Sequence, residues 1–222
     1  MKTERLIVNA LTFARVPLIF AWLGFAIAQE FTISATGDGS LVLAIVACAM
    51  MLLSGLTDAW DGALARKWNV VSSLGKMADP LMDKVFYVMT FPALTWLVAH
   101  QGESDVHAIA LLVFTILYIL RDLWVTFMRS VGSLYGADVS AMWLGKVRTA
   151  LSFPAAGWIY AYAALHLSGL VNAHLPADSA WRDAWLWSCY AVEGFMTLLN
   201  VFSCIVYTKA YMPFLKKALE QR

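Results

Sequence analysis

Six apolar runs, each close to 20 residues long, constrain this chain more than any other feature of its sequence. A helix of about 20 residues is long enough to cross the hydrocarbon layer of a bilayer, which is roughly 30 Å thick. The runs cover residues 8–29, 39–57, 81–101, 106–128, 149–170 and 185–208. Lipid offers the backbone no hydrogen-bond partners, so each run has to be helical. The sequence therefore predicts an all-α integral membrane protein with six transmembrane helices in a single domain, residues 1–222.

The composition supports this interpretation and excludes a soluble domain. Hydrophobic residues make up 61% of the 222 residues and charged residues only 14%, whereas about 25% of an average soluble protein is charged. The net charge is +1, so the charges are informative through their positions rather than their sum. We expect membrane lipids as partners and no nucleic acid.

The basic residues predict the orientation of the six spans, because cytoplasmic loops are enriched in Lys and Arg. One side of the predicted topology carries Lys2, Arg5, Arg66, Lys67, Lys76, Arg129, Lys146, Arg148, Lys209, Lys216, Lys217 and Arg222. The opposite side carries a single basic residue, Arg182. Both termini are therefore predicted to be cytoplasmic, in a multi-pass protein of the cytoplasmic (inner) membrane.

The first apolar run has a second interpretation, as a cleaved signal peptide. Lys2 and Arg5 precede it and it ends in Ala26-Ile27-Ala28, which is the order of features in a signal sequence. Arg15 and Pro17 interrupt the run, however, and its removal would leave five spans. These features favour a retained first span.

Four aspartates lie where the second predicted span ends and the third begins. Asp58 and Asp61 are three residues apart and Asp79 and Asp83 four apart, so each pair shares one face of a helix. The two spans are joined by a short basic loop, which predicts antiparallel neighbours whose carboxylate pairs meet at one depth. Four carboxylates this close repel one another unless cations bind between them. Oxygen ligands of this kind favour Mg²⁺ or Mn²⁺.

Small and basic residues between the two pairs indicate a phosphate-containing substrate. Gly62 and Ala65 leave an indentation at which a ligand can approach the helix, and Arg66 supplies a cation for a phosphate. Taken singly, Gly62 and Ala65 also fit simple helix packing, and Arg66 fits a positive charge of a cytoplasmic loop. Their combination with the aspartates favours the ligand site.

The complete pattern is Asp58-x2-Asp61-Gly62-x2-Ala65-Arg66-x8-Gly75-x3-Asp79-x3-Asp83. It resembles the signature of the CDP-alcohol phosphatidyltransferases at every fixed position. The resemblance implies a metal-dependent enzyme of six spans that acts as a homodimer, with CDP-diacylglycerol as donor, CMP as product and two divalent ions per active site. It also implies that Asp58, Asp61, Asp79 and Asp83 bind the metals, that Asp83 is the general base, and that Asp61, Gly62, Ala65, Arg66 and Gly75 receive the donor nucleotide.

Three further segments resemble the bacterial phosphatidylglycerophosphate synthases within that family. They are Asn9-x2-Thr12-x2-Arg15, Arg121-Asp122 with Arg129, and Ala141-x3-Gly145-Lys146-x-Arg148-Thr149. Asp122 stands where Glu is expected and Arg148 where Lys is usual, and both differences preserve the charge. This resemblance implies sn-glycerol 3-phosphate as the acceptor and phospholipid biosynthesis as the role.

A dianionic acceptor needs cations beside the aspartates, and four residues are candidates: Arg121, Arg129, Lys146 and Arg148. Arg121 is favoured because an arginine within a span is costly unless it binds an anion or pairs internally, for example with Asp122. For Arg129, Lys146 and Arg148, a topological role as cytoplasmic loop charges is an equal alternative.

Two rival functions stay open at this point. The same donor could react with another acceptor, such as phosphatidylglycerol to give cardiolipin, an inositol phosphate or serine; basic residues for an acceptor phosphate argue against serine. A cation transporter is a different class, since aspartates within spans can form an ion path. Toward the far side, however, only Glu193 would continue such a path, and no partner for Glu193 can be identified from the sequence.

Overall fold

A computed structural model describes residues 2–37, 39–70, 73–101, 105–138, 142–167, 170 and 180–220; for residues 2, 73–77, 79, 166, 167 and 182 it describes the backbone alone. The described part contains helices and no strand. The helices are α1 (Lys2–Thr36), α2 (Leu41–Lys67), α3 (Ser73–His100), α4 (Asp105–Leu134), α5 (Trp143–Ala161), the π-helix η1 (Tyr162–Leu167) and α6 (Ala180–Glu220).

The helices are longer than the apolar runs that predict them. The second run, residues 39–57, becomes α2 to Lys67, and the third run, which starts at residue 81, becomes α3 from Ser73. α2 begins after Ser40, whose Oγ accepts a hydrogen bond from the Leu43 backbone N–H (3.4 Å). α2 is followed by a turn at Asn69, whose φ of 52° lets the Val70 N–H donate a hydrogen bond to the Ala65 carbonyl (3.1 Å). The aspartate signature therefore lies on helical extensions of two spans.

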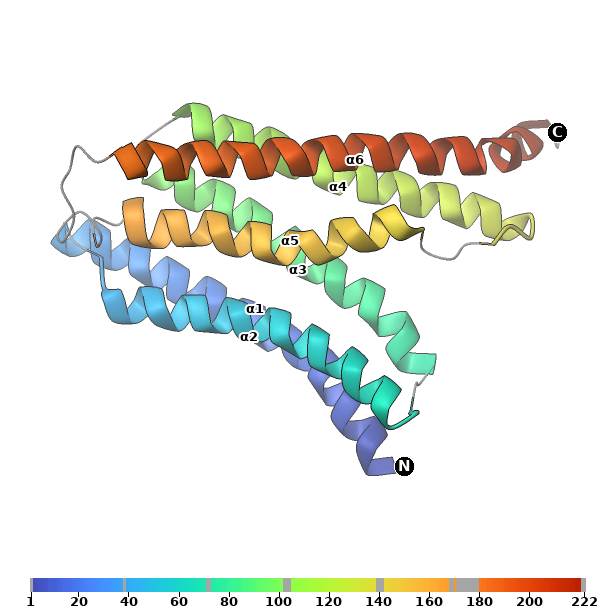
Figure 1. Cartoon of the computed structure of the whole chain (residues 1–222), viewed down its shortest axis with the longest axis horizontal. Helices are drawn as coiled ribbons and strands as arrows, with labels where there is room; N and C mark the ends of the chain where they lie inside the picture. Colours follow the sequence, from blue (N-terminus) through green and yellow to red (C-terminus); the bar gives the residue numbers. More distant parts are fainter. Residues whose placement is uncertain are drawn as a thin grey trace.

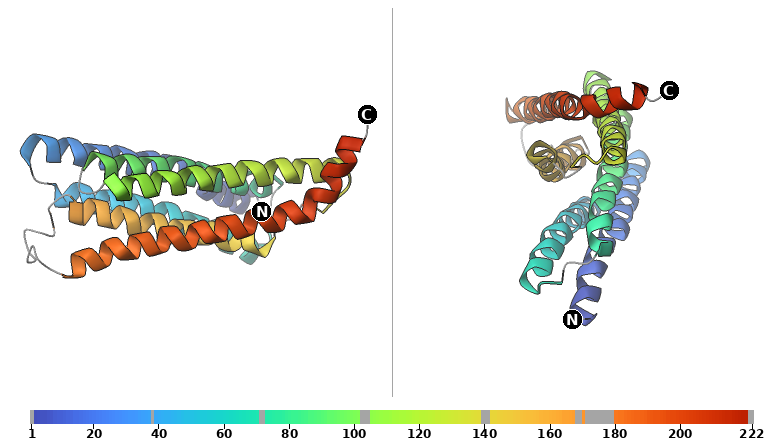
Figure 2. Two further views of the ribbon diagram at one scale, coloured as in Figure 1. Left: turned by 90° about the horizontal axis from the view of Figure 1, so that it is seen from above. Right: turned by 90° about the vertical axis from the view of Figure 1, so that its right-hand side faces the viewer.

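Figure 1 shows the helices side by side, with α1 and α2 on one side of the bundle and α4 and α6 on the other. α1 packs against α2 and α3, while α4 packs against α3 and α6. The end-on view in Figure 2 shows the same two groups of helices. α1 begins and α6 ends at the same end of the bundle (Figure 1), which is the arrangement expected when the chain crosses an even number of times.

The prediction of an all-helical membrane protein is confirmed, and five helices are long and apolar enough to cross a bilayer. They are α1, α2, α3, α4 and α6. The predicted fifth span, residues 149–170, corresponds to α5 and η1, which together occupy residues 143–167. α5 is 19 residues long and its first two turns carry Lys146 and Arg148, so it does not qualify by itself.

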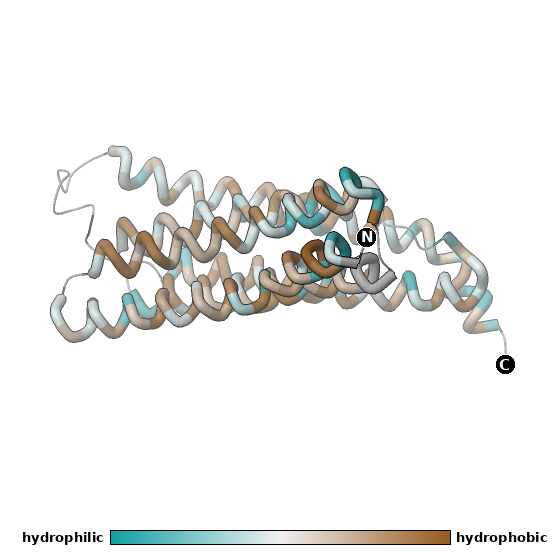
Figure 3. The backbone as a smooth tube through the Cα atoms, turned by 90° about the horizontal axis from the view of Figure 1, so that it is seen from below, coloured by the Kyte–Doolittle hydropathy of each residue, from teal (hydrophilic) through white to brown (hydrophobic). Residues whose placement is uncertain are grey.

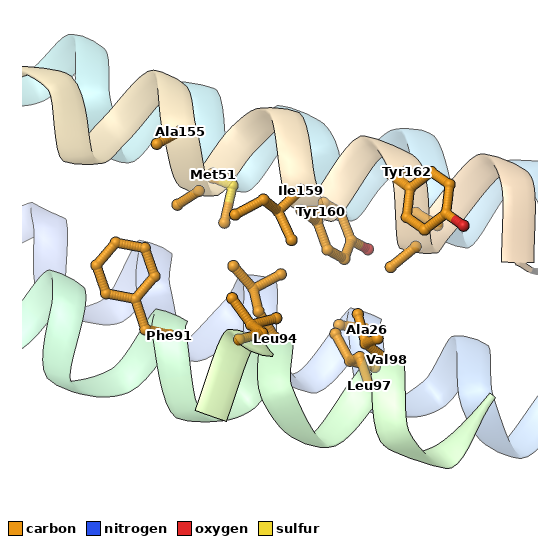
Figure 4. Packing of buried hydrophobic residues seen from close by; sticks show 14 of the residues in the cluster. Ala26, Met51, Phe91, Leu94, Leu97, Val98, Ala155, Ile159, Tyr160 and Tyr162 are labelled. Carbon is orange, nitrogen blue, oxygen red and sulfur yellow. The ribbon is translucent and has the colours of Figure 1, made fainter. Parts of the chain in front are cut away.

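The core between the two groups of helices is apolar and aromatic. Figure 4 shows Met51 and Ile159 facing Phe91 and Leu94 across the bundle. Large apolar side chains also cover the outside; Leu52, Ile109 and Leu198 are exposed, as lipid-facing residues must be. In Figure 3 hydrophilic residues gather mainly toward the end of the bundle that contains the N-terminus.

Three polar contacts join α4 to α6 along their length. His107 Nε2 lies 2.9 Å from Glu193 Oε1, and both residues are buried. Arg121 donates to Ser203 Oγ, and Trp124 Nε1 donates to Thr208 Oγ1 (2.8 Å). The structure thus identifies the partner of Glu193, and this contact binds two spans together.

Candidate functional site

Three of the four signature aspartates converge on one arginine. Asp58 and Asp61 come from the last turns of α2 and Asp83 from the third turn of α3, as their spacing predicts. Arg15 of α1 contacts Asp58 Oδ1 through Nη2 and Asp83 Oδ1 through Nη1 (2.8 Å), and its Nη2 lies 3.8 Å from Asp61 Oδ2. The Thr12 hydroxyl donates to Asp61 Oδ2 at 2.7 Å. The carboxylates are therefore held close together by side chains of α1.

The prediction that α2 and α3 pack directly against each other is wrong. α1 packs against both of them, whereas the described residues of α2 and α3 make little direct contact with each other. The carboxylates of the two helices meet because Thr12 and Arg15 lie one turn apart on the α1 face that both helices cover. The sequence pattern Asn9-x2-Thr12-x2-Arg15 includes both of these α1 residues, but it did not indicate which residues Arg15 contacts.

The remaining signature residues lie on the same two helices. Gly75 and Asp79 are in α3, but the Asp79 side chain and the surroundings of Gly75 lie outside what the structure describes. Gly62 and Ala65 are half-buried in α2 and Arg66 is exposed. A Cβ atom at Gly62 would lie 3.5 Å from Arg66 Nη1, so the Arg66 guanidinium covers the open face of this glycine.

A cavity of about 630 Å³ opens beside the carboxylates. Its walls include Asp58 and Asp83 together with the four basic residues predicted for the acceptor, Arg121, Arg129, Lys146 and Arg148. Residues more than 60 positions apart in the sequence thus line one space. An anionic group in this cavity would lie between the aspartate cluster and a basic wall.

The basic wall is organised around Asp122, which also lines the cavity. Its Oδ1 accepts a hydrogen bond from Arg148 Nη2 (3.1 Å) and lies 3.7 Å from Arg121 Nη1, and its Oδ2 lies 3.1 Å from Lys84 Nζ. One carboxylate from α4 therefore contacts cations from α3, α4 and α5.

The four predicted acceptor residues differ in how they are held. Arg121 and Arg148 are buried, at 7% and 2% exposure. Arg121 donates to Ser203 and lies over the Tyr207 ring (5.1 Å), while Arg148 also donates to Asn200 Oδ1 (3.3 Å) and lies over the Tyr118 ring (4.2 Å).

By contrast, Lys146 is exposed and Arg129 is half-buried. The preference for Arg121 rested on the cost of an arginine within a span. Groups of the protein itself offset much of that cost, so Lys146 becomes the stronger candidate to contact a ligand.

The aspartate cluster has the donor chemistry that a hard divalent cation requires, since all its ligand atoms are carboxylate oxygens. Among the described side chains, no three His, Cys, Asp or Glu residues form a ready cluster around a common metal position. Asp58, Asp61 and Asp83 instead surround the Arg15 guanidinium, which shows that they can gather around positive charge.

Comparisons with known proteins agree with the signature. Residues 5–191 match the family described as CDP-alcohol phosphatidyltransferase. A CDP-diacylglycerol–glycerol-3-phosphate 3-phosphatidyltransferase of Rickettsia bellii is 30% identical over 211 residues, which is 95% of this chain and 99% of that protein. The Bacillus subtilis protein of the same name is 34% identical over 143 residues, covering 64% of this chain and 69% of the relative.

A relative with a different name also matches. The cardiolipin synthase (CMP-forming) of Streptomyces coelicolor is 35% identical over 98 residues, which is 43% of this chain but only 42% of that protein. These identities are too similar to one another to distinguish the two acceptors.

Proposed function

We propose a reaction for this chain from one premise: it belongs to the CDP-alcohol phosphatidyltransferase family. The chain transfers the phosphatidyl group of CDP-diacylglycerol to sn-glycerol 3-phosphate, giving phosphatidylglycerophosphate and CMP. The observation that carries the proposal is a cavity lined both by Asp58 and Asp83 and by Arg121, Arg129, Lys146 and Arg148. Such a cavity suits an acceptor that has both a reacting hydroxyl and a phosphate.

In this proposal the aspartates serve the reacting phosphate groups. Asp58, Asp61, Asp79 and Asp83 would hold two Mg²⁺ or Mn²⁺ ions, which supply positive charge to the diphosphate of the donor. The convergence of Asp58, Asp61 and Asp83 on Arg15 supports this fit. Asp83 accepts the proton of the acceptor's primary hydroxyl as that oxygen attacks the phosphorus next to the diacylglycerol. The bond between this phosphorus and the CMP oxygen breaks, and no covalent intermediate with the protein is needed.

The donor and acceptor use different surfaces. Asp61, Gly62, Ala65, Arg66 and Gly75 receive the cytidine nucleotide, and the position of Arg66 over Gly62 is compatible with a guanidinium that closes on a phosphate. The acceptor phosphate lies against the basic wall. Lys146 and Arg129 contact it directly, and Arg121 and Arg148 add positive charge from behind.

The proposal places the chain in the inner membrane as one domain, residues 1–222. α5 with η1 forms the fifth of six spans, both termini are cytoplasmic, and the cavity opens to the cytoplasm at headgroup depth. The concentration of Lys and Arg in the loops of one side supports this orientation. A homodimer is part of the proposal through the family resemblance.

The test is an acceptor assay. Purified protein in detergent is incubated with CDP-diacylglycerol, Mg²⁺ or Mn²⁺, and one acceptor at a time, and released CMP is measured. We expect glycerol 3-phosphate to support the reaction, with the Asp83→Asn variant as the inactive control. CMP release with phosphatidylglycerol instead would make the chain a cardiolipin synthase, and release with an inositol phosphate would likewise refute the glycerol 3-phosphate assignment.

A further inference from the structure

Arg15 is the most deeply buried charged residue near the aspartate cluster. Its side chain is 0% exposed, although it lies in the middle of α1 and carries a permanent positive charge. It contacts carboxylates from two other helices, Asp58 and Asp61 on α2 and Asp83 on α3. Neither the signature nor the proposed reaction assigns this arginine a role.

In the contacts of Arg15 with these aspartates, the carboxylates outnumber the cation. Three described carboxylates surround one guanidinium, and Thr12, the other α1 side chain in contact with the cluster, is neutral. Repulsion between carboxylates is strong where water is scarce, so the removal of Arg15 would take away the cation that these three carboxylates share. The cluster depends on Arg15 for its compact arrangement.

Arg15 contacts carboxylates of the cavity wall without lining the cavity itself. The side chains of Asp58 and Asp83 are 43% and 27% exposed and both line the cavity, whereas Arg15 does not line it. A cation that enters through the cavity can therefore reach Asp58 and Asp83 while Arg15 contacts them from outside its lining. This geometry allows two sources of positive charge to act on the same carboxylates.

We propose that Arg15 is the internal counter-cation of the aspartate cluster: it positions Asp58, Asp61 and Asp83 before any divalent cation binds, and a bound divalent cation partly replaces its effect. Arg15 is a positioning residue, since it acts on the reactants through the aspartates. The first half of this proposal depends on the observed contacts alone. The second half rests on the proposed function, because it requires that a divalent cation binds the cluster.

The alternative role for Arg15 is packing. Its guanidinium lies 5.8 Å from the centre of the Phe153 ring, so the side chain also fills space between α1 and α5. Packing and charge compensation make opposite predictions for a second substitution at an aspartate. If Arg15 only fills space, removal of a carboxylate adds to the damage; if it compensates charge, removal of a carboxylate repairs part of it.

The experiment measures the thermal unfolding midpoint, Tm, of purified protein in detergent with EDTA. The variants are Arg15→Met, Asp58→Asn, the double variant Arg15→Met/Asp58→Asn, and Arg15→Lys. Arg5→Met is the matched control, because it removes an exposed positive charge from the same helix. We expect Arg15→Met to lower Tm by about 10 °C, as for the loss of one partner of a buried ion pair. The double variant should regain at least half of this loss, Arg15→Lys should lose less than Arg15→Met, and Arg5→Met should be close to wild type.

A second measurement adds Mn²⁺ to each protein without substrate. We expect Mn²⁺ to raise Tm more for Arg15→Met than for wild type, because the variant lacks the competing internal cation. A double variant that is no more stable than Arg15→Met, or an Arg15→Met protein as stable as wild type, overturns the counter-cation role. If Arg15→Met does not yield folded protein, recovery of a monodisperse double variant supports the role and its failure to fold overturns it. If Mn²⁺ changes the Tm of no protein, including wild type, the proposed metal role fails, and the comparison in EDTA still decides the role of Arg15.

Discussion

The ion pairs of Asp122 lead to a quantitative prediction about the basic wall. Asp122→Asn keeps the shape of the side chain and removes the charge that faces Lys84, Arg121 and Arg148. The loss of one partner from a buried ion pair costs about 3–5 kcal/mol, and Arg148 is only 2% exposed. Arg148 retains Asn200 and the Tyr118 ring, which places the cost near the lower end of this range. The Lys84 side chain is 36% exposed, so the loss of its contact adds at most about 1 kcal/mol.

We therefore expect Asp122→Asn to reduce the free energy of unfolding by about 3 kcal/mol, and Tm by about 10 °C for a chain of this length. Thermal unfolding in detergent measures the change. Asp105→Asn is the matched control, since it makes the same substitution at an exposed position of α4. Asp122→Glu keeps the charge and should recover most of the stability. A Tm for Asp122→Asn within about 2 °C of the control would refute the assignment of Asp122 as the common partner of these cations.

Four further outcomes follow from the site. Asp83→Asn should reduce the rate of CMP release by about 100-fold or more, as expected for the loss of a general base, and EDTA should abolish release from wild type; full activity in EDTA would contradict the metal role. Lys146→Met should raise the apparent KM for glycerol 3-phosphate about 10-fold and change that for CDP-diacylglycerol little, because one charge-assisted contact is lost; equal changes in both would place Lys146 elsewhere. Gly62→Leu should prevent CDP-diacylglycerol binding while Tm stays near that of wild type, since the new side chain occupies the face now covered by Arg66; unchanged nucleotide affinity would move the donor site. A cysteine at Asp38 should react with an impermeant reagent only from the outer side of the membrane, and labelling only from the cytoplasmic side would reverse the topology.

The sequence was sufficient to predict the helices and the faces that carry the signature. The spacing of Asp58 and Asp61 placed both on one side of α2, and both contact groups of α1. The apolar runs located five spans because hydropathy measures the length that lipid must cover. The ends of the helices were not predicted, since the polar extension of α2 to Lys67 has no apolar signal.

The lateral order of the helices could not be read from the sequence. Several faces of a membrane helix are apolar whether they contact lipid or another helix, so nothing indicated that α1 lies against both α2 and α3. For the same reason the sequence could not connect His107 with Glu193, which is 86 residues away. The suggested pairing of Arg121 with Asp122 is present at 3.7 Å, but adjacent residues of a helix point about 100° apart. Their closest contacts are therefore with different helices, Arg121 with Ser203 and Asp122 with Lys84 and Arg148.

The contacts between α4 and α6 have a consequence for the order in which the protein is made. α4 leaves the ribosome well before α6, and until α6 is inserted His107 lacks Glu193 and Arg121 lacks Ser203. While these polar side chains lack their partners, α4 is less stable at its final position in the bilayer. Arg121 and Tyr207 both line the cavity, and Tyr207 belongs to the last helix. The lining of the cavity is thus completed only when the C-terminal helix has been inserted, so a chain released early by the ribosome carries the four basic residues without Ser203 and Asn200, which contact Arg121 and Arg148.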